Sequence, residues 1–164
     1  MLSKNTKPSA EEVKMNKVII GCDPDSDKSG IAVYKNGQLH SMKSRSLVEV
    51  YSLFDHISDK YECAELHIEN LKGVSAAFTG ANAKQPQAVK MKMAQYVGMC
   101  KQVQTEVERI AEHFGIKVVH HKISKQWKDA KTGKQLFQRA TGWEGKSNED
   151  TRSAAYFGFL GCRK

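Results

Sequence analysis

The sequence lacks any long hydrophobic run. A helix that crosses a bilayer needs about 20 consecutive apolar residues, and no stretch of this chain approaches that length. The first 16 residues also lack the apolar segment of a secretory signal peptide. We therefore expect a cytoplasmic protein without a membrane span, in which residues 1–16 form a disordered, charged tail.

Cysteines at metal-ligand spacing are also missing. The four cysteines are far apart, and no two of them form a C-x-x-C motif: Cys22, Cys63, Cys100 and Cys162. This spacing argues against a structural zinc site and against a dithiol redox centre. We expect reduced thiols that act as small core residues. No repeat or linker divides the chain, so residues 17–164 are expected to form one domain.

Negative charge is in the minority. The chain has 26 lysines and arginines against 18 aspartates and glutamates, which gives a net charge of +8. Net charge alone can serve solubility. The lysines, however, gather at Lys90, Lys92 and Lys101 and again between residues 122 and 146. This clustering favours a polyanionic partner such as nucleic acid, whose binding weakens steeply as the salt concentration rises.

Apolar, β-branched segments predict the strands of a sheet. We expect strands at residues 18–22 and 30–34, followed by a tight turn at Asn36-Gly37 and an antiparallel strand at 39–43. Two further strands are expected at 66–69 and 117–121. Because helical segments separate the later strands, the chain is predicted to be an α/β protein with a five-stranded mixed sheet flanked by helices.

Periodic apolar residues and capping signals predict the helices. Ser46 and Glu49 form a capping box that begins the first helix. Residues 87–114 form the longest helix, with apolar side chains at steps of three and four. We interpret it as a core helix, part of which could also form a dimer interface. Short basic helices are expected at 124–130 and 134–141, and Ser147 or Asn148 caps a final helix.

Three carboxylates lie where these elements would bring them together. Asp23 and Glu69 each end an apolar strand, and Asp150 opens the final helix, with Glu149 beside it. The carboxyl ends of neighbouring parallel strands form the usual site of an open α/β sheet. Oxygen ligands without histidine or cysteine favour Mg²⁺, with Mn²⁺ as the alternative. Two such ions about 4 Å apart could support metal-assisted phosphodiester hydrolysis.

Each acid also has an ordinary explanation. Asp23 precedes a proline in a turn, Asp150 complements a helix dipole, and Glu69 could be a surface acid. The segment from Asp23 also imitates a calcium loop, but Lys28 stands at its sixth position and Tyr34 at its twelfth. The metal interpretation requires that the three acids meet around one divalent ion. It fails if any of them is buried in a permanent ion pair with a lysine.

Several basic and aromatic residues are candidates for contact with DNA. The long loop after Glu69 is expected to be functional. In it, Phe78 could act as a wedge at an unpaired or branched site. Lysines of this loop and of the later basic region are expected to bind the phosphate backbone: Lys72, Lys84, Lys122, Lys125, Lys128 and Lys134. His120 and His121 alternate along a strand, so they point to opposite faces and cannot share one ion.

These motifs together resemble the RuvC family of Holliday-junction resolvases, within the RNase H-like superfamily. The resemblance runs from Lys17 to Cys162 and includes GCDPDSDKSGIAVY, LHIEN, the long helix with Gly98, and DTRSAAYFGFLGC. It implies an RNase H-like fold and a homodimer that nicks four-way DNA junctions with Mg²⁺. Asp23 would then stand in the place of the family's metal-binding aspartate, and Glu69 in that of the catalytic glutamate.

The chain departs from the family pattern at its last motif. The family ends on two acids spaced by three residues, whereas Asp150 is followed at that spacing by Ser153 and preceded by Ser147. One carboxylate is therefore missing. The neighbouring Glu149 is the candidate metal ligand that could compensate, although adjacent residues on a helix point about 100° apart. Asp25 also replaces a small residue of the first turn. Two alternatives stay open: a catalytically silent DNA-binding module on the same fold, and an RNA-cleaving relative.

Overall fold

The computed structural model describes residues 17–73 and 84–163. The predicted tail at 1–16 and the candidate wedge Phe78 lie outside the described residues. One five-stranded sheet organises the fold, in the order β3-β2-β1-β4-β5. The strands and helices are β1 (Lys17–Asp23), β2 (Ser29–Lys35), β3 (Gln38–Arg45), α2 (Leu47–Lys60), β4 (Cys63–Glu69), α3 (Gln87–His113), β5 (Lys117–His121), α4 (Thr132–Thr141) and α5 (Glu149–Cys162).

The central strand β1 joins the two halves of the sheet. It pairs antiparallel with β2 and parallel with β4, and β4 pairs parallel with β5. The register places Cys22 beside Ile68, so Asp23 and Glu69 end neighbouring strands at the same edge. The predicted mixed sheet is confirmed, and its strands begin and end within a few residues of the expected positions.

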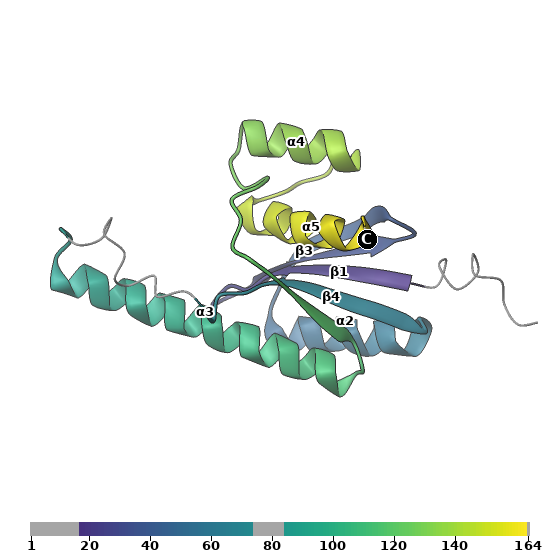
Figure 1. The fold of residues 1–164 in the computed structure, drawn as a ribbon, viewed down its shortest axis with the longest axis horizontal. Coiled ribbons are helices and arrows are strands. Elements are labelled where there is room, and N and C mark those ends of the chain that lie inside the picture. Colours follow the sequence, from purple (N-terminus) through teal and green to yellow (C-terminus); the bar gives the residue numbers. More distant parts are fainter. Residues whose placement is uncertain (1–16, 74–83, 164) are drawn as a thin grey trace, which may run out of the picture.

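Helices cover both faces of the sheet (Figure 1): α2 and α3 lie on one side, and α5 lies on the other with α4 stacked outside it. Successive side chains of β1 point to opposite faces of the sheet, so this strand contributes to the hydrophobic core on each face. Val18 and Ile20 belong to the core under α2 and α3, whereas Ile19 belongs to the core that includes Ala154 and Phe137. The sheet is thus buried on both faces, as its apolar strands predict.

Glycines let α5 approach the sheet closely. A Cβ atom on Gly21 would lie 1.9 Å from the backbone oxygen of Ala154, and one on Gly30 would lie 2.2 Å from the backbone oxygen of Asp150. Gly30 is the register partner of Asp23. The close packing therefore brings the first turn of α5 to the edge of the sheet where β1 ends.

The long helix α3 is buried along only part of its length. Its buried residues, Cys100, Gln104, Val107 and Ala111, all lie in its C-terminal half. The N-terminal half extends beyond the sheet (Figure 1), and its Met91 is 65% exposed. The expectation of a core helix is therefore correct for the C-terminal half and wrong for the N-terminal half, because the sheet does not reach that far.

The capping predictions are confirmed, and one helix prediction is wrong. The Ser46 hydroxyl accepts the backbone N–H of Glu49, whose carboxylate accepts the N–H of Ser46. Asn148, rather than Ser147, caps α5. Residues 124–130 form turns instead of the expected helix, because Trp127 adopts a left-handed φ of 64°. No helix in the described ranges is both long and apolar enough to cross a membrane.

Candidate functional site

A cavity of about 270 Å³ lies where β1 and β4 end. Its lining includes all four predicted acids, Asp23, Glu69, Glu149 and Asp150. Asp23 and Glu69 come from neighbouring parallel strands and are 5% and 3% exposed. Asp150 is half-buried in the first turn of α5, and Glu149 beside it is exposed. The structure thus brings together acids that are far apart in the sequence.

Crowding of negative charge perturbs the acids of this cavity. Burial, and then the neighbouring Asp23 carboxylate, raise the pKa of Glu69 to about 7. Burial also raises the pKa of Asp150, with further contributions from the charges of Asp23 and Asp25. Like charges that share a poorly solvated site favour the protonated form unless a cation is present. The cavity is therefore suited to a positively charged occupant.

Lys128 supplies a cation to this cavity. Its Nζ atom lies 3.1 Å from Asp23 Oδ2 and 3.9 Å from Glu69 Oε1. Glu69 Oε1 also accepts the backbone N–H of Ser124 at 3.3 Å. Burial opposes the charge of Lys128, but the negative charges of Asp23 and Glu69 outweigh it and raise the pKa of the lysine. Lys128, which was predicted to bind the DNA backbone, therefore lies among the acids instead. An ion pair of this kind would weaken the metal interpretation if it were permanent.

The turn that carries Lys128 is held by Arg152. This buried arginine donates from Nε to the Trp127 carbonyl at 2.8 Å, from Nη2 to the Lys128 carbonyl, and from Nη1 to Ser147 Oγ at 3.2 Å. The left-handed backbone of Trp127 costs about 1–2 kcal/mol in a residue other than glycine. Packing of its ring against Phe137 offsets this cost. Sequence reasoning missed Arg152, because no local pattern links it to a turn 25 residues away.

Asp25 lies at the rim of the same cavity and is tied to α3. Its Oδ2 accepts the hydroxyl of Tyr96 at 2.5 Å, and its Oδ1 accepts the backbone N–H of Asp27 at 3.0 Å. This hydrogen bond, followed by burial, raises the pKa of Tyr96. The first turn of the sheet therefore contacts the exposed half of the long helix beside the acids.

Neither serine of the last motif replaces the missing carboxylate. Ser153 is 1% exposed, and its Oγ has no hydrogen-bond partner among the described residues. Ser147 Oγ accepts a hydrogen bond from Arg152. In the part of the chain that the structure describes, neither side chain is among those that line the cavity.

The donor set fits a hard divalent cation, although the side chains as placed do not enclose one. Asp23 Oδ2 is buried and has no hydrogen-bond partner among the described residues, and the Lys128 ammonium lies 3.1 Å from it. Carboxylate oxygens are the ligands that Mg²⁺ prefers. Within residues 17–73 and 84–163, no three histidine, cysteine, aspartate or glutamate side chains are arranged to hold a metal ion. A bound ion would require the acids to close in around it.

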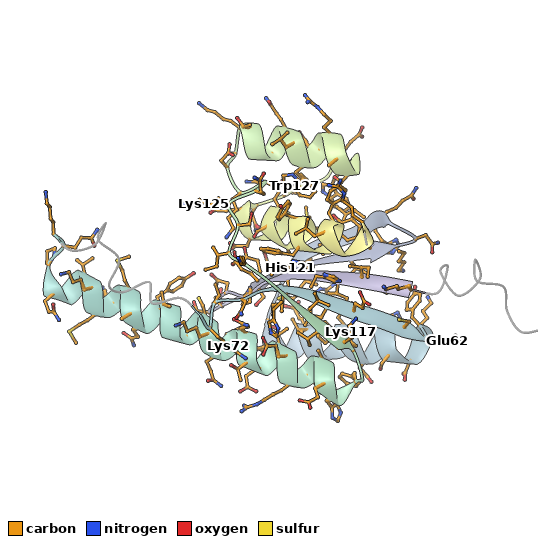
Figure 2. The ribbon with its side chains drawn as sticks, viewed as in Figure 1. Glu62, Lys72, Lys117, His121, Lys125 and Trp127 are labelled. Atoms are coloured by element: carbon orange, nitrogen blue, oxygen red, sulfur yellow. The ribbon has the colours of Figure 1, made fainter. Side chains whose placement is uncertain are left out.

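The other predicted lysines lie on the surface. Lys72 pairs with Glu108 of α3, and Figure 2 shows Lys125 on the segment between β5 and α4. These lysines do not line the cavity. Among the described residues, Lys128 is the only predicted lysine that does. All five are exposed: Lys72, Lys84, Lys122, Lys125 and Lys134.

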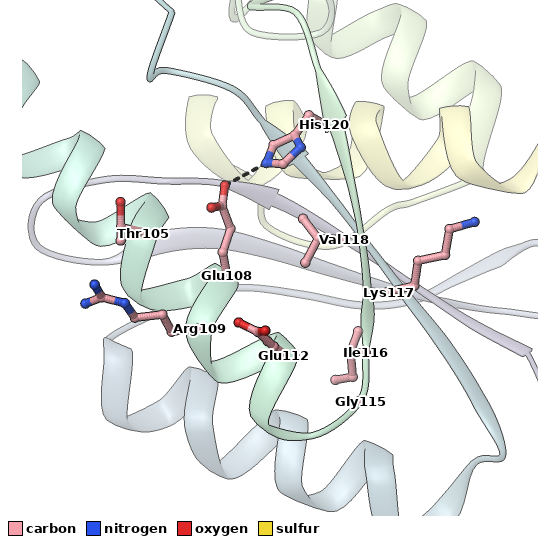
Figure 3. A pocket seen from close by; sticks show the side chains of 9 residues that line it. All are labelled: Thr105, Glu108, Arg109, Glu112, Gly115, Ile116, Lys117, Val118 and His120. Atoms are coloured by element: carbon pink, nitrogen blue, oxygen red, sulfur yellow. Dashed lines mark hydrogen bonds and ion pairs between the residues drawn. The ribbon is translucent and has the colours of Figure 1, made fainter.

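The two adjacent histidines point to opposite faces of β5, as predicted. His120 Nε2 lies 2.8 Å from Glu108 Oε1 in a groove of about 450 Å³ between α3 and β5 (Figure 3). The ring of His121 stacks on Phe157 of α5. Its Nε2 lies 2.8 Å from Nδ1 of the buried His67, a contact that sequence reasoning missed because it joins two different strands.

No family model matches this sequence, and no curated protein matches it. Among solved structures, the chain is similar to RuvC from T. thermophilus in complex with a Holliday junction substrate, with a TM-score of 0.56 and 13% identity over 87% of this chain and 90% of that one. A second Thermus thermophilus RuvC structure has a TM-score of 0.48 and 15% identity, over 87% of this chain and 91% of that one. The fold is therefore RNase H-like and similar to that of RuvC.

Proposed function

We propose that this protein is a Mg²⁺-dependent endonuclease that resolves four-way or other branched DNA junctions. One observation carries the proposal: Asp23, Glu69 and Asp150 line a single cavity at the carboxyl ends of parallel strands. Two further features support it. The fold is similar to that of a protein solved with a Holliday junction substrate, and the chain has a net charge of +8.

The residues present define what each would contribute. Asp23, Glu69 and Asp150 would hold Mg²⁺ or Mn²⁺, and the exposed Glu149 would reach it from the rim. The bound ion would activate water and polarise the phosphate. The buried side chains of Asp23 and Glu69 form part of the wall of the site. Lys128 offsets part of the negative charge that would otherwise repel a DNA phosphate.

The exposed lysines would bind the DNA backbone. Lys84 precedes α3, Lys122 and Lys125 follow β5, and Lys134 lies on α4. Lys72 could exchange Glu108 for a phosphate, because an exposed ion pair is worth little. Phe78 would act as a wedge at an unpaired or branched site. Loss of several lysines should weaken binding and reduce its salt dependence.

The exposed half of α3 would form the interface of a homodimer. Met91 is 65% exposed and Met99 49%, and Val89 and Tyr96 are also exposed large hydrophobic residues. Contiguous exposed apolar residues mark interaction surfaces. A second copy of this chain is the natural partner, because symmetric cutting of a four-way junction needs two sites related by a twofold axis.

The test is nicking of a synthetic four-way junction beside a linear duplex of the same sequence. We expect Mg²⁺-dependent nicking of the junction. Asp23→Asn should abolish cutting and preserve junction binding, because it removes a ligand charge without changing shape. Asp27→Asn is the matched control, since Asp27 is exposed in the same turn. Unimpaired cutting by Asp23→Asn would refute the assignment of the metal site.

A silent DNA-binding module is the second candidate. The Lys128–Asp23 ion pair and the serine at position 153 favour it. Junction binding without nicking, at any Mg²⁺ or Mn²⁺ concentration, would support this candidate over the nuclease. An RNA-cleaving relative would share the same metal chemistry, and it is excluded if only DNA junctions are cut.

A further inference from the structure

Lys128 does not behave as an ordinary surface lysine. Its side chain is only 20% exposed, and its Nζ lies within 4 Å of two acids that are nearly fully buried. Surface lysines keep a mobile, hydrated ammonium group. The ammonium of Lys128 is instead largely withdrawn from water and faces the floor of the cavity.

The protein backbone is built to present this side chain. Trp127 adopts a left-handed conformation that a bulky residue rarely takes, and its indole ring is anchored against Tyr156 of α5 at 5.3 Å between centroids. The buried Arg152 binds the carbonyl oxygens of both Trp127 and Lys128. A Cβ atom on Gly133 would lie 2.8 Å from the Trp127 carbonyl carbon, so the start of α4 closes over the same turn.

The charges of the cavity match one lysine and one divalent ion. The acids of its interior are Asp23, Glu69 and Asp150, with Lys128 among them. When these acids are ionised, Lys128 neutralises one charge, and a single divalent ion neutralises the remainder. The ammonium of Lys128 lies close to both Asp23 and Glu69, where a second divalent ion would also need these two carboxylates.

The two acids of the rim surround this interior. Asp25 accepts hydrogen bonds from the Tyr96 hydroxyl and the Asp27 N–H, and its negative charge contributes to the raised pKa of Asp150. Glu149 is exposed, so its charge is screened by water and salt. The interior acids would therefore make the direct contacts with a bound ion beside Lys128, and the rim acids would add to the negative field around it.

We propose that Lys128 is a cationic member of the site that takes the place of one divalent ion, so that the site binds a single ion. This inference rests on the proposed metal-dependent function. Each carboxylate oxygen can accept two partners, so Asp23 can bind Lys128 and a metal ion together. Arg152 is a positioning residue, because it holds the turn without touching the acids.

The test counts Mn²⁺ ions on the full chain without DNA, by isothermal titration calorimetry and electron paramagnetic resonance. We expect one ion in the wild type and two in Lys128→Met, which keeps the length of the side chain and removes its charge. The first ion should bind at least tenfold more tightly to this variant, since a unit charge about 4 Å away is worth more than the 1.4 kcal/mol that a tenfold change requires. Lys131→Met, at an exposed lysine three residues later, should match the wild type.

Two ions in the wild type would overturn the inference, and so would equal numbers of ions in the wild type and in Lys128→Met. The wild-type count decides the matter even if Lys128→Met does not fold. Arg152→Lys provides a second variant: it should release the turn and raise the number of ions above one, whereas a purely structural Arg152 would leave the count unchanged.

The measurement also separates this inference from the proposed function. A protein that binds one Mn²⁺ ion but nicks no junction would refute the nuclease and leave the role of Lys128 standing. A wild type that binds no divalent ion would refute both.

Discussion

Replacement of Glu69 by glutamine tests whether its carboxylate is forced into a crowded anionic cavity. Burial and the neighbouring Asp23 raise the pKa of Glu69 to about 7, whereas a glutamate in an unfolded chain titrates near about 4.3. The folded state therefore binds this proton more tightly than the unfolded state. It follows that the free energy of unfolding of the metal-free protein falls as the pH rises between these two values.

The size of the effect follows from the pKa difference. One pKa unit corresponds to about 1.4 kcal/mol, so the cost of ionising Glu69 in the folded protein is on the order of 1–3 kcal/mol above about pH 8. Glutamine keeps the shape of the side chain, and its carbonyl oxygen can still accept the N–H of Ser124. Glu69→Gln should therefore be more stable than the wild type by about this amount near pH 8, and nearly equal to it near about pH 5.

Urea denaturation with a chelator present, across this pH range, measures the difference directly. In a second series with Mg²⁺ and no chelator, the ion should stabilise the wild type more than Glu69→Gln near about pH 8, because an ion that binds only the folded state raises stability by mass action. Glu62→Gln is the control, since Glu62 is exposed between α2 and β4 (Figure 2). If the stability of Glu69→Gln follows that of the wild type at every pH, the acids do not crowd one another and the reasoning is wrong.

Two further predictions concern the framework of the site. Gly21→Ala should lower the melting temperature and displace Asp150, because its Cβ atom would lie 1.9 Å from a backbone oxygen of α5, and overpacking of this kind costs about 1–3 kcal/mol or more. Gly98→Ala is the control: it has open space around it and should leave the melting temperature equal or higher. Equal losses of melting temperature in both variants would contradict the packing argument. Met91→Glu with Met99→Glu should shift the protein from dimer to monomer in analytical ultracentrifugation without a loss of helix content, and an unchanged sedimentation coefficient would place the dimer interface elsewhere.

The strands and caps could be predicted because their signals are local. The Asn36-Gly37 turn joins β2 to β3, with φ values of 51° and 75° that suit these two residues. The box formed by Ser46 and Glu49 begins α2. Alternation and capping act between residues a few positions apart, so they are visible in the sequence before any tertiary contact forms.

The acids at the edge of the sheet were also within reach of the sequence. Asp23 and Glu69 each follow an apolar strand, and the rule that parallel strands end at a common edge brings them together. The exposed half of α3 was less predictable. Its apolar residues recur with the same spacing as those of the buried half, and only the size of the sheet decides which of them are covered.

The sequence by itself determined the order of the elements, the strand-end positions of two acids, and the excess of positive charge, because each depends on residue type and spacing along the chain. Only the tertiary structure decided that Lys128 lies between Asp23 and Glu69 and that Arg152 holds the turn behind it. Those contacts join β1, β4, α5 and an irregular turn. No short-range pattern encodes them, since they arise when α5 packs onto the glycines of the sheet and brings its buried arginine against a backbone far away in sequence.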